Sequence, residues 1–530
     1  MLILHNARIY TLDPQRPVAT ALAIEQDRIV AVGEAAEIMD WAHAGSSVQD
    51  MEGKVILPGL VDAHIHLQHF ALNLQRVDCE TPTRAECLRR VAERVAQTPP
   101  GQWILGHGWN QNVWPEGFGS AQDLDVLTSM HPVFLTAKSL HAAWVNSTAL
   151  RLAGIDEHTP DPPDGRIQRD ERGQPTGILF EAAVELVQRC IPQPGVQEVA
   201  QAIQEAQSAL WRMGLTGVHD FDQRTCFLAL QILQREGRLM LRVLKSLPAD
   251  LLDEAINLGL GSGFGDAWLR IGGVKLFSDG ALGPQTAAMF EPYLERDDRG
   301  LLFLDAEQIF EMGRKAGEVG LSLAVHAIGD RANAEVLTGL ERLRVWETAS
   351  GKPHLRHRIE HVQLLRPQDV GRLARAGIIA SVQPIHATSD MYMADRYWGE
   401  RARFAYAYRS LLAQGTRLAF GSDAPVETPN PFWGIHAAVT RRRQDGQPGP
   451  EGWFPQERLT LEHALEAYTL GPAYAAGLEH NLGRLREGYY ADLIVLDEDP
   501  WQLPADLLYQ LQPCATMVGG KWVWVKGGTE

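Results

Sequence analysis

The chain has 530 residues, of which 45% are hydrophobic and 22% charged, as in ordinary water-soluble globular proteins. A formal net charge of −17 argues against nucleic-acid or anionic-membrane partners, because both are bound through basic surfaces. No apolar run of about 18 residues could span a membrane, and the opening "MLILHNARIYTLDPQ" lacks the basic start of a signal peptide. The five scattered cysteines lack Cys-x-x-Cys spacing, so we expect reduced thiols and a cytoplasmic protein.

Short strand-like segments alternate with turns at both ends of the chain. Residues 1–58 show this pattern around turn signals such as "EQDR" and "MEGK". Residues 484–530 repeat it in "ADLIVLDEDP" and "CATMVGGKWVWVKGG". Because chain ends often lie close together, we predict one small β-sandwich composed of both ends.

Between these ends, residues 59–483 alternate short apolar segments with amphipathic stretches such as "DAEQIFEMGRKAGEVG". Eight strands alternating with helices favour an α/β fold of the (β/α)8 or TIM barrel type over an open sheet. The predicted strands cover residues 60–66, 214–221, 241–247, 270–279, 321–328, 355–362, 377–384 and 416–424.

A long stretch, residues 68–210, separates the first predicted strand from the second. A connection of this length must carry structure of its own. We therefore predict an inserted subdomain that lies over the mouth of the barrel.

Ionisable residues recur at the carboxyl ends of the predicted strands, where barrels of this type place their functional groups. His64 and His66 share one face of the first strand, because side chains two residues apart point the same way. Taken singly, His326 could be a core histidine and Asp423 a helix cap. Together, histidines and a carboxylate form a suitable ligand set for zinc or a similar divalent ion. The residues at strand ends are His64, His66, His219, Asp220, Lys275, Asp279, His326, His361 and Asp423.

Lys275 stands within the apolar segment "IGGVKLFSDGALG". A buried ammonium without a partner is costly, so such a lysine usually shifts its pKa or forms an ion pair. A salt bridge to Asp279 or Asp220 is one explanation for this lysine.

Five separated motifs occur in the order typical of the amidohydrolase superfamily. They are "PGLVDAHIHL", "GGVKLFSDGALG", "LAVHAIGDRA", "RIEHVQ" and "FGSDAPVETPNPFWGI". The segments "GHGWNQNVWP", "LHAAWVNSTAL" and "GILFEAA" add similarity to its amidohydrolase 3 branch, the YtcJ-like proteins and N-substituted formamide deformylases. The chain resembles this branch over nearly its whole length.

The resemblance implies a divalent-metal centre, with zinc as the expected ion. His64 and His66 would bind one metal, and His326 and His361 a second. Lys275 would bridge the two as a carbamate, since burial lowers the pKa of the amine and a neutral amine reacts with carbon dioxide. One metal in place of two, and an unmodified lysine, remain open alternatives.

Asp423 is the implied catalytic residue, and it would also contact a metal. It would take a proton from the attacking water and pass it to the leaving nitrogen. The implied reaction is hydrolysis of a non-peptide C–N bond in an amide, formamide or cyclic imide. The alternatives are hydrolytic deamination of a heterocyclic ring, against which Lys275 weighs, and an inactive metal-binding regulatory homologue. The expected partner is a small-molecule substrate, and members of the superfamily are often homodimers or larger.

Predicted substrate contacts come from the inserted subdomain and from the barrel mouth. The segment "GHGWNQNVW" combines tryptophans with Asn110 and Asn112, which suits a pocket wall. The alternative is that Trp109 and Trp114 form the subdomain's own core. Glu181 would hold a loop by a salt bridge. The predicted substrate contacts are Trp109, Asn110, His141, Asp279 and His386.

Overall fold

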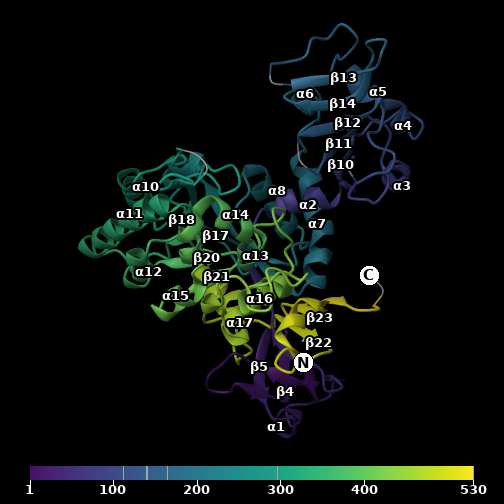
Figure 1. Cartoon of the computed structure of the whole chain (residues 1–530). Helices are drawn as coiled ribbons and strands as arrows, with labels where there is room; N and C mark the ends of the chain where they lie inside the picture. The colour runs from purple at the N-terminus through teal and green to yellow at the C-terminus, as the bar shows by residue number, and fades with distance from the viewer. Residues whose placement is uncertain (112, 139–140, 164, 295–296, 529–530) are drawn as a thin grey trace. The chain divides into compact units, whose positions relative to one another are not determined.

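The computed structural model describes residues 1–111, 113–138, 141–163, 165–294 and 297–528. The chain divides into two compact units. Figure 1 colours the chain by residue number. One unit combines Met1–Phe70 with Ile203–Glu530, and the other is Ala71–Ala202. The second unit falls inside the predicted insertion, residues 68–210.

Eight parallel strands form the barrel of the first unit, in the order β21-β20-β19-β18-β17-β16-β15-β8. Ile65 pairs with Ala424 in a parallel bridge, and the Asp423 amide donates to the His64 carbonyl at 2.7 Å, so the two edge strands meet. Each strand overlaps one predicted segment, which confirms the barrel. The strands are β8 (Leu60–Ile65), β15 (Leu215–Asp220), β16 (Arg242–Pro248), β17 (Leu269–Phe277), β18 (Ser322–Ala327), β19 (Arg358–His361), β20 (Ile379–Val382) and β21 (Leu418–Phe420).

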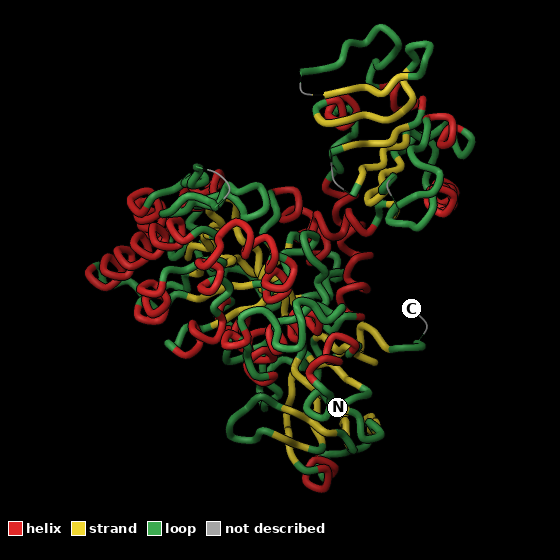
Figure 2. Tube along the Cα trace, viewed as in Figure 1, coloured by secondary structure: helices red, strands yellow, loops and turns green. Residues whose placement is uncertain are grey.

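Helices connect these strands (Figure 2). The predicted helical stretch before the fifth barrel strand is α10 (Ala306–Glu318), which begins with a capping box between Asp305 and Gln308. Among the described residues, no helix is both long enough and apolar enough to cross a membrane. The other barrel helices are α7 (Val196–Arg212), α8 (Arg224–Arg235), α9 (Leu252–Asn257), α11 (Asp330–Ala349), α12 (Val370–Arg375), α13 (Pro384–Ser389), α14 (Met391–Trp398), α15 (Tyr408–Ala413), α16 (Pro431–Thr440), α17 (Leu461–Tyr468) and α18 (Leu470–Ala475).

Two further sheets in this unit are built from the chain ends, as predicted. In the mixed sheet, β7 (Val55–Pro58) pairs antiparallel with β22 (Leu493–Leu496) from the other end of the chain. Leu4 and Leu22 share a hydrophobic core with Leu493 and Met517. One sheet contains β1 (Leu2–His5), β4 (Ala21–Glu25), β5 (Arg28–Gly33) and β6 (Ser47–Asp50). The mixed sheet contains β2 (Arg8–Tyr10), β3 (Val18–Ala19), β7 (Val55–Pro58), β22 (Leu493–Leu496), β23 (Pro513–Val518) and β24 (Lys521–Val525).

The inserted unit has a six-stranded sheet of its own, in the order β13-β14-β12-β11-β10-β9, and its own hydrophobic core. The long connection therefore carries independent structure, whereas its place over the barrel mouth stays a prediction. Its elements are β9 (Val77–Asp78), α3 (Arg84–Gln97), β10 (Ile104–Trp109), α4 (Ala121–Asp125), β11 (Val133–Ala137), β12 (Ala142–Val145), α5 (Ser147–Leu152), β13 (Gly165–Arg169), β14 (Pro175–Glu181) and α6 (Ala183–Gln188).

A buried ion pair ties the barrel to the mixed sheet. Arg242 of β16 donates to both carboxylate oxygens of Asp492, at 2.5 and 2.9 Å, and both side chains are almost fully buried. We expect Asp492→Asn to lower the free energy of unfolding by about 3–5 kcal/mol, because it leaves the guanidinium without a counter-charge. Urea unfolding measures the change. The control Asp497→Asn, in a largely exposed pair with Lys54, should cost less than about 1 kcal/mol; equal losses would contradict the prediction.

Candidate metal centre

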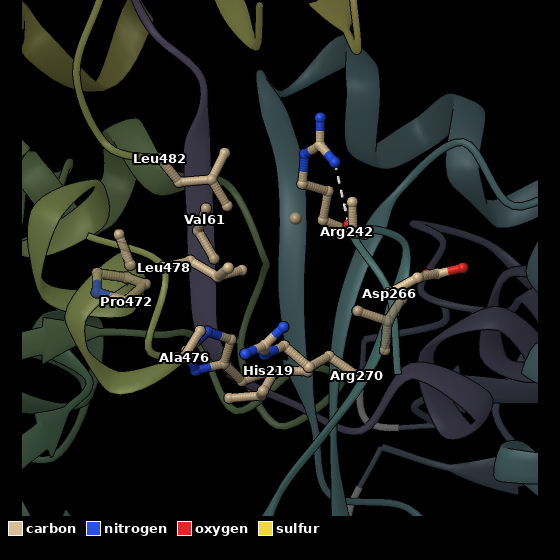
Figure 3. A pocket seen from close by; sticks show the side chains of 14 residues that line it. Val61, His219, Arg242, Asp266, Arg270, Pro472, Ala476, Leu478 and Leu482 are labelled. Atoms are coloured by element: carbon tan, nitrogen blue, oxygen red, sulfur yellow. Dashed lines mark hydrogen bonds between the residues drawn. The ribbon is translucent and has the colours of Figure 1, made fainter. Parts of the chain in front are cut away.

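The structure brings the predicted metal residues to one cavity of about 370 Å³. They lie at the carboxyl ends of β8, β17, β18 and β19 and in the turn after β21. A second cavity, beside Arg242 and Val61, has a volume of about 30 Å³ (Figure 3). That volume holds about one or two water molecules, so we place the chemistry in the larger cavity. Its predicted metal residues are His64, His66, Lys275, His326, His361 and Asp423.

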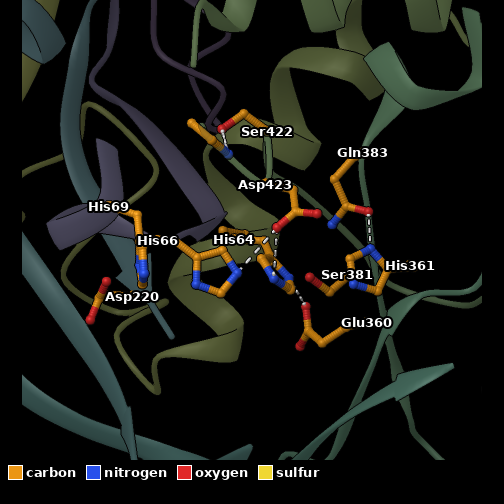
Figure 4. Close-up of polar contacts among 12 residues, drawn as sticks. His64, His66, His69, Asp220, Glu360, His361, Ser381, Gln383, Ser422 and Asp423 are labelled. Carbon is orange, nitrogen blue, oxygen red and sulfur yellow. Dashed lines mark hydrogen bonds and ion pairs between the residues drawn. The ribbon is translucent and has the colours of Figure 1, made fainter. Parts of the chain in front are cut away.

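His64 and His66 both turn an Nε2 atom toward Asp423 (Figure 4). These atoms lie 3.5 and 3.4 Å from Oδ1 of Asp423, and the three residues form a cluster with metal-ligand spacing. Each Nδ1 faces a carboxylate: Glu360 at 2.6 Å from His64, and Asp222 at 3.1 Å from His66. Such a partner holds the proton on Nδ1. Burial lowers the pKa of His64 to about 4, so its Nε2 lone pair is free for a metal. Burial also acts to lower the pKa of His66, but Asp222 and Asp423 outweigh it and raise that pKa to about 9, so a metal would displace a proton there.

The backbone around these residues is locally strained. Asp423 has φ 62°, and His361 and Val362 have φ 74° and 47°. Residues other than glycine rarely adopt this region, and such strain clusters at functional sites. Gly421 lets the turn approach β8, because a Cβ there would lie 2.4 Å from the His64 amide nitrogen. The turn "GSD" therefore places Asp423 against both histidines.

A second cluster with metal-ligand spacing contains His361, His386 and Asp423. His361 Nδ1 lies 2.9 Å from Oε1 of Gln383, and the His361 and His386 rings are nearly parallel with centroids 6.3 Å apart. His386 is buried, and its Nε2 has no hydrogen-bond partner within the described chain. The sequence indicated a substrate contact at His386, whereas the structure also makes it a candidate ligand. Its only sequence signal was its place just after the seventh strand.

His326 lies outside both clusters. Its Nε2 is 2.9 Å from the Gly280 carbonyl oxygen, although its ring is 4.6 Å from that of His361. Burial, aided by the charge of Lys275, lowers the pKa of His326 to about 4. It is therefore a neutral imidazole, the form that binds metals, and its predicted pairing with His361 at a second metal stays a prediction.

Lys275 is buried, and none of the residues that the structure describes forms an ion pair with it. Across the described residues its ammonium forms no hydrogen bond or ion pair, and Nζ lies 4.4 and 5.0 Å from the ring centres of Phe221 and Phe277. Burial lowers its pKa to about 8, a fall that Glu360 and Asp423 oppose. Roughly one amine in ten is therefore neutral at pH 7, a far larger share than for a lysine with an ordinary pKa.

The salt bridges considered for Lys275 are wrong, because both acids are engaged elsewhere. Asp220 pairs with the fully buried Lys245 at 2.8 Å. Asp279, also predicted to contact substrate, instead accepts backbone hydrogen bonds of 2.8–3.0 Å that hold loops together. The donors to Asp279 are the amides of Ala288, Ile328 and Gly329.

The sequence did not single out the residues that support the histidines. Arg358 pairs with Glu360 and also donates to the Ala63 carbonyl at 2.6 Å and to His219 Nδ1 at 2.9 Å. His219 is thus a hydrogen-bond acceptor within the barrel. The available signal was "RIEH", in which Arg358 and Glu360 are two residues apart and share a face.

In the inserted unit, Trp109 is a core residue, which corrects its prediction as a substrate contact. It is 1% exposed and donates to the Leu135 carbonyl at 2.7 Å, while Trp114 donates to the Thr81 carbonyl at 2.9 Å. Buried indole N–H groups need such partners, so the alternative that these tryptophans form a core is confirmed.

The other predicted contacts of this unit are more open to solvent. His141 Nδ1 lies 2.9 Å from Oε2 of Glu181, and both side chains are exposed. Asn110 directly follows β10, and Asn112 lies outside the described residues. A role for Asn110 and His141 in substrate binding stays a prediction.

Histidines, an aspartate and a buried lysine at the mouth of a parallel barrel define a metal-dependent hydrolase. The chain belongs to the amidohydrolase family, whose sequence pattern matches residues 47–524. It is 33% identical to the putative amidohydrolase YtcJ of Bacillus subtilis, over 99% of both chains. It is 29% identical to N-substituted formamide deformylase of Arthrobacter pascens, over 98% of this chain and 97% of that one. An uncharacterized metal-dependent hydrolase from Pyrococcus furiosus has a similar structure, with a TM-score of 0.78 and 33% identity over 94% of this chain and all of that one.

Proposed function

We propose that this protein hydrolyses a non-peptide C–N bond in an amide, formamide or cyclic imide. The observation that carries the proposal is the convergence of His64, His66 and Asp423 beside the unpaired Lys275 in one cavity. Similarity to an N-substituted formamide deformylase supports a small amide as substrate. Lys275 weighs against ring deamination, since deaminases of this superfamily typically lack the bridging lysine.

The donor set fits a divalent ion, with zinc favoured by its imidazole ligands. His64, His66 and Asp423 would hold one ion, and the cluster of His361, His386 and Asp423 offers a second position. When bound, such an ion polarises a substrate carbonyl and acidifies water.

Asp423 would act as the general base and then the acid. Burial acts to raise the pKa of its carboxyl, but the facing imidazoles, His66 first, outweigh burial and hold the pKa well below its usual range. The group is therefore ionised at neutral pH and able to accept a proton from water. The proton would next pass to the leaving nitrogen.

We also propose that Lys275 carries a carbamate when the protein is active. Its supports are burial, the lack of an ion-pair partner and a pKa lowered to about 8. We expect ¹³C-bicarbonate to give a carbamate resonance in the wild-type protein that disappears in Lys275→Met. Activity restored by zinc should then require bicarbonate. A fully active protein without this resonance would favour a single metal and an unmodified lysine.

Metal analysis and a substrate panel test the proposed function. The purified protein, stripped with a chelator and reloaded with zinc, is assayed on formamides, N-acyl amino acids, hydantoins and aminopyrimidines. We expect turnover within the amides or imides that disappears on stripping and returns on reloading. Turnover of aminopyrimidines alone would indicate a deaminase, and metal binding without any turnover would indicate a regulatory homologue.

A further inference from the structure

The cavity of the metal residues carries two carboxylates beyond the proposed ligands. Asp390 directly follows α13, and Glu427 lies beyond the turn that holds Asp423. Among the described residues that line the cavity, Lys275 is the single lysine and there is no arginine. Apart from Lys275 and the histidines, the ionisable side chains that line the cavity are acidic.

Both carboxylates have oxygen atoms available to a ligand. The Tyr406 hydroxyl donates to Oδ2 of Asp390 at 2.6 Å, and within the described chain the other oxygen accepts no hydrogen bond. The Glu427 carboxylate has neither a hydrogen bond nor an ion pair with any described residue. Two such acceptors in one cavity favour a cation or an N–H donor and disfavour an anion.

Two buried polar groups in the same cavity also lack partners. Gln363 is 4% exposed, and its Oε1 accepts no hydrogen bond from the described residues. The buried Nε2 of His386 also has no hydrogen-bond partner among the described residues. Buried polar groups are nearly always paired, so the orphan oxygen of Gln363 is available to a hydrogen-bond donor that enters the cavity.

Apolar side chains complete the wall. Phe277 and Val426 line the cavity although 48% and 67% exposed, and Leu282 and Met393 lie there as well. Apolar walls with a few convergent polar groups are typical of small-molecule sites. The wall therefore offers an amide partner, an apolar surface and two carboxylates.

We propose that the substrate is an amide whose nitrogen substituent is an apolar segment ending in a protonated amine. Gln363 binds the amide, the apolar side chains contact the segment, and Asp390 and Glu427 bind the ammonium. This inference rests on the proposed hydrolysis of a C–N bond. Anionic substrates such as N-acyl amino acids are disfavoured, because their carboxylate would meet two like charges.

Three N-alkylformamides of equal length, ending in methyl, ammonium or carboxylate, test the proposal on the zinc-loaded protein. We expect kcat/KM for the ammonium compound to exceed that of the methyl compound by about tenfold and that of the carboxylate by about 100-fold or more. The double substitution Asp390→Asn and Glu427→Gln should reduce the preference over methyl to less than about threefold, mainly through KM.

Two control variants separate recognition from other effects. Tyr406→Phe removes the hydrogen bond to Asp390 but keeps both carboxylates, so the preference should persist. Glu462→Gln, at an exposed position of α17 outside the cavity, changes the net charge alone and should also preserve it. Loss of the preference in Glu462→Gln would assign it to the overall charge and overturn the proposal.

The same compounds distinguish failure of this inference from failure of the proposed function. Equal kcat/KM for all three formamides would overturn the cationic specificity while leaving the hydrolase intact. Absence of turnover of these compounds and of the whole panel of amides and imides would contradict the hydrolase. Calorimetric Kd values for the three compounds would then test the charge preference alone. Equal Kd values would overturn it.

Discussion

Replacement of Asp423 with asparagine is expected to lower kcat by about 10²–10⁴-fold, the usual contribution of a general acid–base group. Asparagine has nearly the same shape and can still contact a metal through its carbonyl oxygen, but it cannot accept a proton. The wild-type carboxylate is ionised because the imidazoles of His66 and His64 face it. Steady-state kinetics on the best amide of the panel, with zinc content measured on the same sample, checks the expectation.

The zinc content decides how the loss is read. A large fall in kcat with zinc retained supports proton transfer by Asp423, whereas a parallel loss of zinc would show that its main role is ligation. Asp497→Asn, on the surface of the chain-end sheets, is the matched control and should leave kcat unchanged. Full activity in Asp423→Asn would contradict the proposed mechanism.

Replacement of Glu360 with glutamine should damage both stability and metal binding. Glu360 is fully buried between Arg358 and His64, so glutamine leaves the guanidinium without its counter-charge. We expect the free energy of unfolding to fall by about 3–5 kcal/mol. Because His64 Nδ1 loses its carboxylate partner, we expect zinc affinity to fall by about 10–100-fold. Urea unfolding of the zinc-free protein and competition with a chelating dye measure the two effects.

Glu457→Gln provides a matched control, because Glu457 is buried and does not line the cavity of the metal residues. Glu457 accepts hydrogen bonds from the amide and hydroxyl of Ser410. Its replacement should lower stability but leave zinc affinity unchanged. Equal zinc affinities in wild-type and Glu360→Gln protein would contradict the orienting role of Glu360.

Much of the fold was predictable from local patterns. Short apolar segments between amphipathic ones marked all eight barrel strands, because strand and helix periodicities depend on neighbouring residues. The turn-rich ends similarly indicated the sheets built from both termini. The sequence predicted that the insertion forms a separate folded unit. It did not predict the order of the strands in its sheet, because that order depends on long-range pairing.

The candidate ligands were predictable for a related reason. Parallel barrel strands all end at the same mouth, so His64, His361 and Asp423 had to approach one another once they were assigned to strand ends. What each residue pairs with was not predictable. The partner of His64 is Glu360, 296 positions away, and no local pattern selects it over other acids.

For Trp109, His386 and Lys275, the tertiary structure decided which residues surround the side chain, and the sequence did not. Sequence composition made Trp109 equally suited to a pocket wall or a core, and only the packing around it placed it in a core. The position of His386 next to His361 and Asp423 depends on how the chain turns after β20.

By itself, the sequence determined that a lysine lies within an apolar barrel strand and that its charge is costly there. Only the tertiary structure decided which acids could neutralise it. Asp220 forms an ion pair with Lys245, and Asp279 accepts hydrogen bonds from backbone amides. Lys275 therefore has no ion-pair partner in the cavity wall, and burial lowers its pKa. The physical reason is that an ion pair forms only where the fold brings two charges close together.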